Sequence, residues 1–229
     1  LLAKTPAVRL STAWEWPQQG QWDLADVIVF YFWNHDWNDE RYKQLDSFLA
    51  KGGGVVVLHS ASVADQDPEK LAQRIGLAFQ PGRSKYRHGP LELKFRSQES
   101  GVRGQESSAG NPFSRDSKRS ASSDSLSPHQ ITAGLSTVHF LDESYWPMIG
   151  DVNRVKVLAT TEEEGKPWPM LWTFEPGKGR VFGCILGHYS WTFDDPICRM
   201  LLFRGLAWAA QDRFDRFMPL VTDGVKWQE

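Results

Sequence analysis

A complete strand–loop–helix signal is carried by Gly177-Lys-Gly-Arg-Val-Phe-Gly-Cys-Ile-Leu-Gly-His188-Tyr-Ser-Trp-Thr-Phe-Asp-Asp-Pro196. The first three residues predict a turn, because glycine reaches backbone angles that other residues avoid. The apolar run 180–186 then predicts a buried strand. Asp195 and Pro196 are typical of a helix start, with aspartate as the N-cap and proline at the first helical position. Residues 197–211 are apolar nearly all round, so we expect a largely buried helix.

His188 stands at the carboxyl end of this predicted strand, just before the helix. Open α/β sheets bind their ligands at that edge, which favours a functional role. The alternative is a core histidine that is hydrogen-bonded to the backbone. Position alone leaves both interpretations open.

Two upstream runs predict strands of the same kind. Residues 27–32 are six β-forming residues without a charge, which is typical of a strand covered on both faces. Residues 55–58 form the next run and end at His59. Between them, Asn38 and the apolar spacing that follows it indicate a capped helix. This succession predicts right-handed βαβ units, with 27–32, 55–58 and 180–186 as parallel neighbours in one sheet of an α/β fold.

The rest of the chain fits around that sheet. Shorter strand candidates lie at 8–10, 91–95, 155–159 and 170–174, the last two leading by short turns into 180–186. Residues 97–127 are rich in Ser, Gly, Arg and Gln, and such a composition buries too little apolar surface to offset the entropy of ordering. We therefore expect a single domain over residues 1–229 with a disordered insertion at 97–127.

The composition argues against several classes of function. A net charge of −2 over 229 residues gives no general attraction to nucleic acid or to anionic membranes. No apolar run approaches transmembrane length, and the two cysteines, Cys184 and Cys198, make no disulfide framework. The chain begins at Leu1 without methionine or a signal-like segment, so we expect an upstream strand and any targeting peptide to precede it. The compartment, cytoplasmic or exported, stays open.

Several motifs in the same order resemble the trehalose-utilisation (ThuA-like) family. They are Gly52-Gly-Gly-Val-Val-Val-Leu-His59, His129-Gln-Ile-Thr-Ala-Gly-Leu135, Asp142-Glu143-Ser-Tyr-Trp146, Val157-Leu-Ala-Thr160 and the run from Gly177 to His188. The family is similar in fold to class I glutamine amidotransferases. The resemblance therefore implies a flavodoxin-like three-layer sandwich with a mostly parallel central sheet. The chain departs from the family in lacking the first strand with its glycine- and histidine-bearing loop, and in having Gln130 where proline is usual.

The same resemblance argues against glutamine amidotransferase activity. In those enzymes a cysteine nucleophile follows the strand that corresponds to 55–58, and a histidine follows a late strand. By that comparison His59 stands at the cysteine position and His188 at the histidine position. An imidazole does not replace a thiolate in amide hydrolysis. Ser60 as nucleophile with His188 as base is a further alternative, although no Gly-x-Ser-x-Gly elbow surrounds it.

Polar residues collect at the predicted strand ends. They are His35, Asp36, His59, Ser60, Asp142, Glu143, His188, Tyr189 and Asp194. Two histidines with a carboxylate suit either general acid–base catalysis or a divalent metal. Adjacent strand residues point to opposite faces, so only one of Asp142 and Glu143 can face such a site, and the resemblance favours Glu143. We predict His59, His188 and Glu143 as catalytic residues, and His59 and His188 as ligands if the cofactor is a divalent metal.

Other ionisable residues have simpler expected roles. We expect Asp194 and Asp195 to cap the helix, His129 and His139 to be structural, and Arg87 and His88 to lie in a basic loop at 83–89. That loop either closes over a ligand or faces water.

The tryptophans bear on the substrate. Those in predicted loops or at strand ends are Trp14, Trp16, Trp33, Trp37, Trp146 and Trp191. Aromatic rings stack on the C–H faces of sugars, whereas a single tryptophan more often fastens a loop to the core. Together they favour a carbohydrate-sized cleft. For it we predict as substrate-binding residues His35, Trp33, Trp37, Ser60, Tyr189 and Trp191.

Two functions of different classes follow. The first is a sugar isomerase or hydrolase with His59 and His188 as acid and base; the resemblance implies trehalose-type glycosides or keto-glycosides as its substrates. The second is a non-catalytic sugar-binding or scaffold module. In both cases the expected partner is a small-molecule carbohydrate, with neither nucleic acid nor membrane. The aromatic tail after Gln211 either packs back or contacts a second copy, so a homo-oligomer stays open.

Overall fold

The computed structural model describes residues 2–6, 8–33, 36–95 and 129–224. Within these residues the strands are β1 (Val27–Phe30), β2 (Gly54–Leu58), β3 (Lys85–Phe95), β4 (Thr137–Trp146), β5 (Lys156–Glu163), β6 (Lys166–Phe174) and β7 (Arg180–Cys184). The α-helices are α1 (Gln19–Leu24), α2 (Asp39–Ala50), α3 (Pro68–Ile75) and α4 (Pro196–Ala209). The predicted insertion at 97–127 and the predicted site residue His35 lie outside the described residues.

The strands form one mixed sheet in the order β1-β2-β7-β6-β5-β3-β4. β1, β2 and β7 are parallel neighbours, as the uncharged runs predicted. The other four pairings are antiparallel, so the expectation of a mostly parallel sheet is wrong. For β5–β6 and β6–β7 the physical reason is connection length, because the turns at 164–165 and 175–179 are too short for the crossover that parallel strands need.

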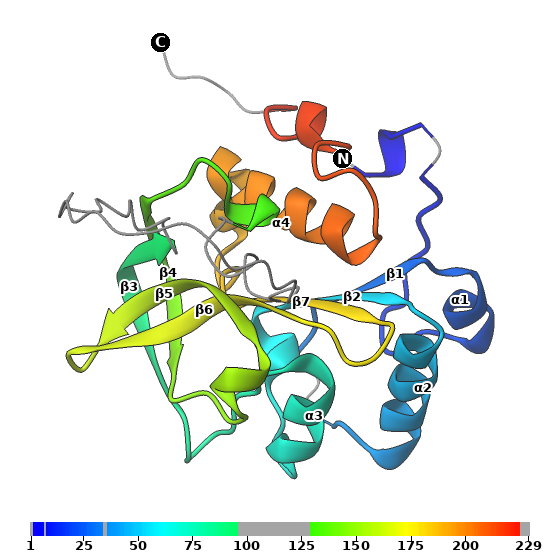
Figure 1. Ribbon diagram of the computed structural model, residues 1–229, viewed down its shortest axis with the longest axis horizontal. Helices are drawn as coiled ribbons and strands as arrows, with labels where there is room; N and C mark the ends of the chain where they lie inside the picture. The colour runs from blue at the N-terminus through cyan, green and yellow to red at the C-terminus, as the bar shows by residue number, and fades with distance from the viewer. Residues whose placement is uncertain (1, 7, 34–35, 96–128, 225–229) are drawn as a thin grey trace, which may run out of the picture.

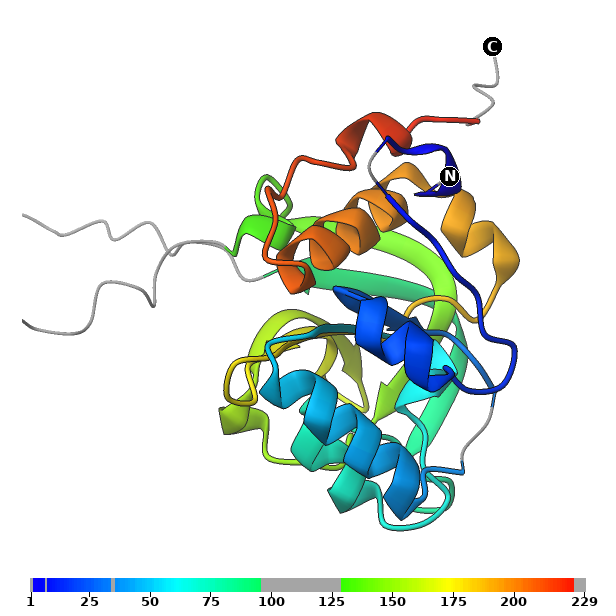
Figure 2. The ribbon, with the colours of Figure 1, turned by 90° about the vertical axis from the view of Figure 1, so that its right-hand side faces the viewer.

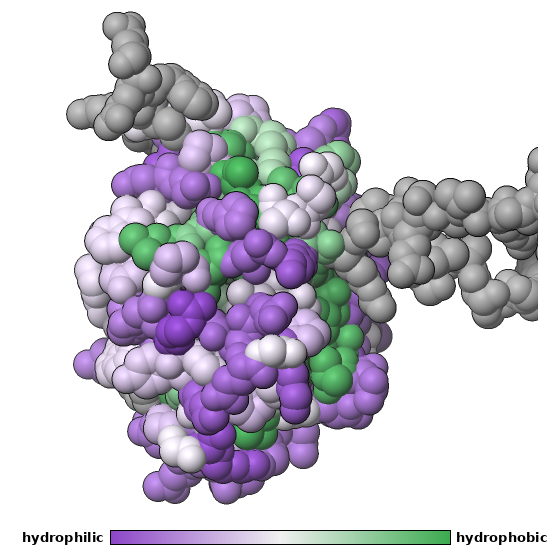
Figure 3. All heavy atoms as spheres, turned by 90° about the vertical axis from the view of Figure 1, so that its left-hand side faces the viewer, coloured by the Kyte–Doolittle hydropathy of each residue, from purple (hydrophilic) through white to green (hydrophobic). Residues whose placement is uncertain are grey.

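The parallel half of the sheet lies between two layers of helices (Figure 1). α4 covers one face of β2 and β7, whereas α2 and α3 lie on the other side (Figure 2). The antiparallel strands β3 to β6 continue the sheet beside this sandwich and are strongly curved (Figure 1). The surface on their side is mostly hydrophilic, with smaller apolar areas between the polar groups (Figure 3). The three-layer expectation therefore applies to the parallel half, within an α/β fold whose sheet is mixed.

Local signals explain where the central elements begin. All five residues of β2 are buried, which requires an uncharged sequence on both faces. α2 starts after Asn38, whose side chain accepts a hydrogen bond from the Arg41 backbone N–H. α4 starts after Asp195, whose carboxylate accepts from the backbone N–H groups of Ile197 and Cys198. The predicted helix starts are thus confirmed.

Two expected elements differ from the structure. Residues 8–10 form no strand; Val8 instead packs at the edge of a small apolar group around Phe203 and Phe217. Residues 83–89, expected as a loop, belong largely to β3, which begins at Lys85 and pairs with β4 along most of its length. Within the described parts of the chain, none of the helices has the length and apolar character that crossing a bilayer requires.

Close contact between α4 and β7 depends on a glycine. A Cβ atom at Gly205 would clash with the ring of Phe182, which is fully buried in β7. The helix can therefore approach the strand only because position 205 carries no side chain.

We expect Gly205→Ala to lower the free energy of unfolding by about 1–3 kcal/mol, because an added methyl group overpacks the core. Gly20→Ala in α1 is the matched control, since a Cβ there meets nothing within 4 Å. It should be neutral or stabilising by up to about 1 kcal/mol through helix propensity. Urea unfolding of both variants measures the difference, and equal stabilities would contradict the packing argument.

Candidate functional site

β2 ends in a strained elbow at His59. This residue has φ +50°, a left-handed conformation that is costly for residues other than glycine. The chain turns there directly into the short 3-10 helix His59–Ser62, and Ser62 Oγ donates a hydrogen bond to the His59 carbonyl at 2.7 Å. The elbow thus places an imidazole at the carboxyl end of a buried parallel strand, where α/β sheets bind ligands.

Three side chains from distant parts of the chain converge at this elbow. His59 Nε2 lies 3.2 Å from Glu143 Oε2, and His188 Nδ1 lies 3.1 Å from the same oxygen. The two histidine nitrogens are 3.3 Å apart. The structure therefore brings together the three residues predicted as catalytic, from the end of β2, from β4 and from the loop after β7.

A fourth residue, His88, contacts the same carboxylate. Strand pairing sets His88 of β3 directly opposite Glu143 of β4, and His88 Nε2 lies 2.9 Å from Glu143 Oε1. Its ring centre is 4.4 Å from that of His188. The sequence analysis placed His88 in a loop that either closes over a ligand or faces water, and did not name it among the site residues. The signal that it lies on a strand was its period-two spacing from Tyr86. We call His59, His88, Glu143 and His188 the histidine cluster.

Asp142, next to Glu143, has different partners. It is fully buried, and its two oxygens accept hydrogen bonds from the backbone N–H groups of Glu143, Gly187 and His188 and from the Thr192 hydroxyl, at 2.6–3.0 Å. This carboxylate, which belongs to β4, therefore holds in place the loop that contains His188. The adjacent carboxylates therefore divide their roles, with Asp142 holding the loop and Glu143 meeting the histidines.

Hydrogen bonding defines the tautomer of His59. Its Nδ1 lies 2.8 Å from the carbonyl oxygen of Ile185, which only accepts, so Nδ1 carries the hydrogen and Nε2 presents a lone pair to Glu143. Burial lowers the pKa of His59, opposed by the hydrogen bond to Ile185 and by the charge of Glu143. The Tyr145 hydroxyl lies 3.4 Å from His59 Nε2, and burial, with the Glu143 charge nearby, raises the pKa of Tyr145 well above its ordinary value. Tyr145 is therefore held as a protonated donor.

The four side chains of the histidine cluster range from buried to partly exposed. The side chains of His59 and Glu143 are 5% and 6% exposed, whereas those of His188 and His88 are 31% and 44% exposed. A ligand therefore reaches the cluster through His188 and His88.

A stacked aromatic pair lies beside the exposed histidines. The rings of Tyr189 and Trp191 are 4.2 Å apart and within 12° of parallel, and Tyr189 is 4.6 Å from the ring of His188. Trp191 is 53% exposed, so this aromatic surface is accessible. Such a surface suits contact with the apolar face of a sugar ring.

Other predicted aromatic contacts belong to the core. Trp37 is buried, donates its indole N–H to the Val63 carbonyl at 3.1 Å and stacks on Tyr42. The structure therefore assigns Trp37 to core packing, because its polar atom has a partner and its ring is inaccessible. Trp146 is likewise buried, whereas Trp33 is exposed.

Among the residues that the structure describes, neither Ser60 nor either cysteine is poised as a nucleophile at the cluster. Ser60 Oγ donates to the Phe32 carbonyl at 2.8 Å, so its hydrogen is not directed at a histidine. Both cysteines are buried, and burial raises the pKa of Cys184 to about 12 and that of Cys198 well above its ordinary value. Their thiolates are strongly disfavoured, which argues against cysteine chemistry. That the chain lacks glutaminase activity stays a prediction.

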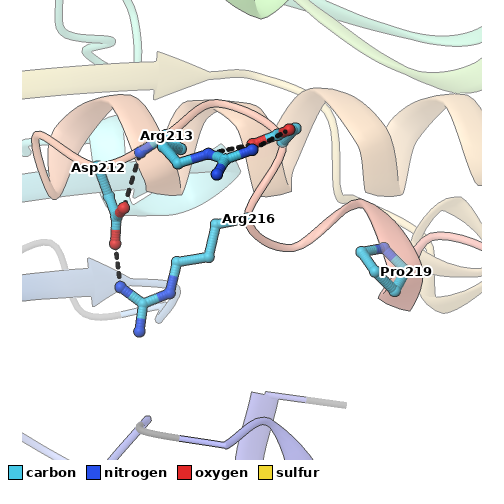
Figure 4. A pocket seen from close by; sticks show the side chains of 5 residues that line it. Asp212, Arg213, Arg216 and Pro219 are labelled. Atoms are coloured by element: carbon cyan, nitrogen blue, oxygen red, sulfur yellow. Dashed lines mark hydrogen bonds and ion pairs between the residues drawn. The ribbon is translucent and has the colours of Figure 1, made fainter.

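A separate hollow of about 410 Å³ lies after α4, lined by Asp212, Arg213, Asp215, Arg216 and Pro219 (Figure 4). Its charged side chains pair with one another, Arg213 with Asp215 and Arg216 with Asp212. Because the paired charges cancel, this hollow lacks a charged group aimed at a ligand, and it shares no residue with the histidine cluster.

The fold and the cluster together define an α/β protein with a histidine–carboxylate site at the ends of parallel strands. The trehalose utilisation family, ThuA, matches residues 9–209, so the chain belongs to that family, and the resemblance found in its motifs is confirmed. A crystal structure from Parabacteroides merdae described as ThuA-like is 22% identical with a TM-score of 0.56, covering 81% of this chain and 70% of that one. Another, from Bacteroides uniformis, is 16% identical with a TM-score of 0.55, covering 80% and 69%. These likenesses show the fold, and none of the curated proteins matches the chain.

We expect Asp142→Asn to lower the free energy of unfolding by about 1–3 kcal/mol, because the amide turns an NH₂ group toward buried donors that need an acceptor. Asp195→Asn is the matched control, since Asp195 uses one oxygen for both of its hydrogen bonds and asparagine caps helices equally well. Urea unfolding compares the two. A similar small effect for both variants would show that the Asp142 network contributes little.

His129 provides a pH-dependent contribution outside the cluster. Its Nδ1 accepts a hydrogen bond from the Ile131 N–H at 3.3 Å, and its ring packs against Trp208. Burial is the main cause that lowers the pKa of His129 from 6.5 to about 4.

Between these two pKa values the unfolded chain binds more protons than the folded chain, so stability should fall as the pH falls from about 6.5 to about 4. His129→Asn keeps an acceptor for the Ile131 N–H but does not titrate. We expect it to reduce the slope of the free energy of unfolding against pH in this range. His139→Asn, at an exposed position, should leave the slope unchanged. Urea unfolding across this pH range tests both variants, and identical slopes would overturn the assignment.

Proposed function

We propose that this chain is an enzyme that converts a carbohydrate by proton transfer at the histidine cluster. The observation that carries the proposal is a single carboxylate, Glu143, in contact with three imidazoles that range from buried to exposed. Such groups exchange protons near neutral pH when they are within hydrogen-bond reach of one another.

The exposed histidines are the groups that a substrate can contact. His88 lies on one oxygen of Glu143 and His188 on the other. The carboxylate can therefore stabilise a proton on either imidazole, so that one acts as acid while the other acts as base. His59 is buried, and its role is to support Glu143. This assignment replaces the expected acid–base pair of His59 and His188 with His88 and His188.

The substrate class rests on the family and on the aromatic pair. The family is described by trehalose utilisation, and Tyr189 and Trp191 offer a flat face next to His188. We propose a trehalose-type glycoside or its keto derivative as substrate, and isomerisation or hydrolysis as the reaction. For a keto-sugar, the base removes the proton from the carbon beside the carbonyl while the acid protonates the carbonyl oxygen, which gives an enediol.

We expect His88→Gln and His188→Gln each to lower kcat/KM by roughly 10²–10⁴-fold, the usual contribution of a general acid or base. Both side chains are partly exposed, so the melting temperature should change little. Turnover of trehalose and of keto-disaccharides, followed by product chromatography, measures the effect.

His139→Gln is the matched control, because His139 is exposed and opposes Glu92 on β3 rather than Glu143. Full activity in His88→Gln would contradict the assigned acid–base pair. Sugar binding by the unaltered chain without any conversion would instead indicate the non-catalytic sugar-binding module.

A further inference from the structure

Three atoms of the histidine cluster meet as a triangle. They are His59 Nε2, His188 Nδ1 and Glu143 Oε2, with separations of 3.2, 3.1 and 3.3 Å. We propose that these atoms are the protein ligands of a divalent transition-metal ion of the zinc type. The inference concerns the site of the proposed function but assigns His188 to the ion instead of to the acid–base pair, and it rests on the proposed function only for the choice of substrate.

The size of the triangle fits a tetrahedral ion. With metal–ligand bonds of about 2.0–2.1 Å, tetrahedral geometry sets the ligand atoms about 3.3 Å apart. The three separations lie close to that value on every side. Three protein ligands occupy one face of the tetrahedron and leave the fourth position open, the arrangement that catalytic zinc sites use for water or substrate.

All three atoms of this triangle can act as electron-pair donors. His59 Nδ1 donates its hydrogen to the Ile185 carbonyl, so Nε2 of a neutral His59 presents a lone pair, and Glu143 Oε2 is also an acceptor. A neutral His188 with its hydrogen on Nε2 likewise presents the lone pair of Nδ1, so all three atoms can face a cation. A cation at the centre is favourable for all three atoms at once.

The surroundings orient each of the three ligands. The Ile185 carbonyl holds the His59 ring through its other nitrogen, an arrangement usual for metal-binding histidines. His88 Nε2 holds the second oxygen of Glu143 at 2.9 Å, so Glu143 offers only Oε2 to the triangle. Asp142 accepts from the His188 backbone N–H and fastens its loop. The outer contacts thus fix which atom of each side chain faces the centre.

The donor set indicates the class of ion. Two imidazole nitrogens and one carboxylate oxygen suit zinc and its first-row neighbours, whereas calcium and magnesium prefer oxygen ligands throughout. A bound ion would polarise a sugar carbonyl or hydroxyl whose oxygen took its open coordination position. His188 would then act as a ligand, which leaves His88 as the exposed imidazole that exchanges protons with the substrate.

The test is metal binding by the untagged full chain after removal of bound metal with a chelator. We expect one equivalent of Zn²⁺ by elemental analysis and titration calorimetry, no comparable binding of Mg²⁺, and the visible absorption of a tetrahedral site with Co²⁺. His188→Ala and Glu143→Gln should weaken Zn²⁺ binding by more than about 100-fold, beyond the effect of losing an outer partner. His188→Ala keeps the test valid if Glu143→Gln fails to fold, because His188 is partly exposed.

His139→Ala controls for binding at a surface histidine and should bind as the unaltered chain does. Substoichiometric Zn²⁺, or equal affinity in His188→Ala, would overturn the metal site. Sugar turnover by the metal-free chain would overturn a role of the ion in the reaction while leaving the proposed function intact. Stoichiometric Zn²⁺ binding lost in both ligand variants supports the metal site, even if the metal-loaded chain converts no sugar and the proposed function fails.

Discussion

One buried carboxylate connects the two halves of the molecule. Asp142 belongs to β4 at the edge of the sheet, yet it accepts hydrogen bonds from the loop after β7, although β6, β5 and β3 lie between these strands in the sheet. This contact is possible because the antiparallel strands curl back toward the carboxyl ends of the parallel ones (Figure 1). Hydrogen bonds to an ionised carboxylate are among the stronger ones, and four donors offset the cost of its burial.

β3 and β4 also carry a second polar network, on the face of the sheet opposite the histidine cluster. His88 pairs with Glu143, and the neighbouring pair, Arg87 and Ser144, binds the buried carboxylate of Glu163 on β5. Alternate residues of a strand face opposite sides, so a slip of one residue would break both sets of contacts. The register of β3 and β4 is therefore held by polar contacts on both faces, and this register positions Glu143.

At the elbow, the backbone conformation of His59 does not by itself determine which chemistry the residue performs. His59 takes a left-handed conformation directly after a buried parallel strand, and its side chain there is an imidazole. An imidazole there can hold a carboxylate or an ion but is a poor acyl acceptor. The strain at the elbow is compatible with either chemistry, because it is a property of the backbone.

The sequence by itself determined the local features. Uncharged runs predicted the parallel strands β1, β2 and β7, and Asn38 and Asp195 marked helix starts. Strand ends pointed to His59 and His188, whereas the family resemblance pointed to Glu143, which lies within β4. These signals act between residues close in the chain or depend only on strand polarity. Only the tertiary structure decided that β3 pairs with β4 and β5 in antiparallel fashion, that Trp37 is core and that His88 faces Glu143. Those outcomes depend on sheet register and curvature, which bring together residues as far apart as His59 and His188, 129 positions along the chain.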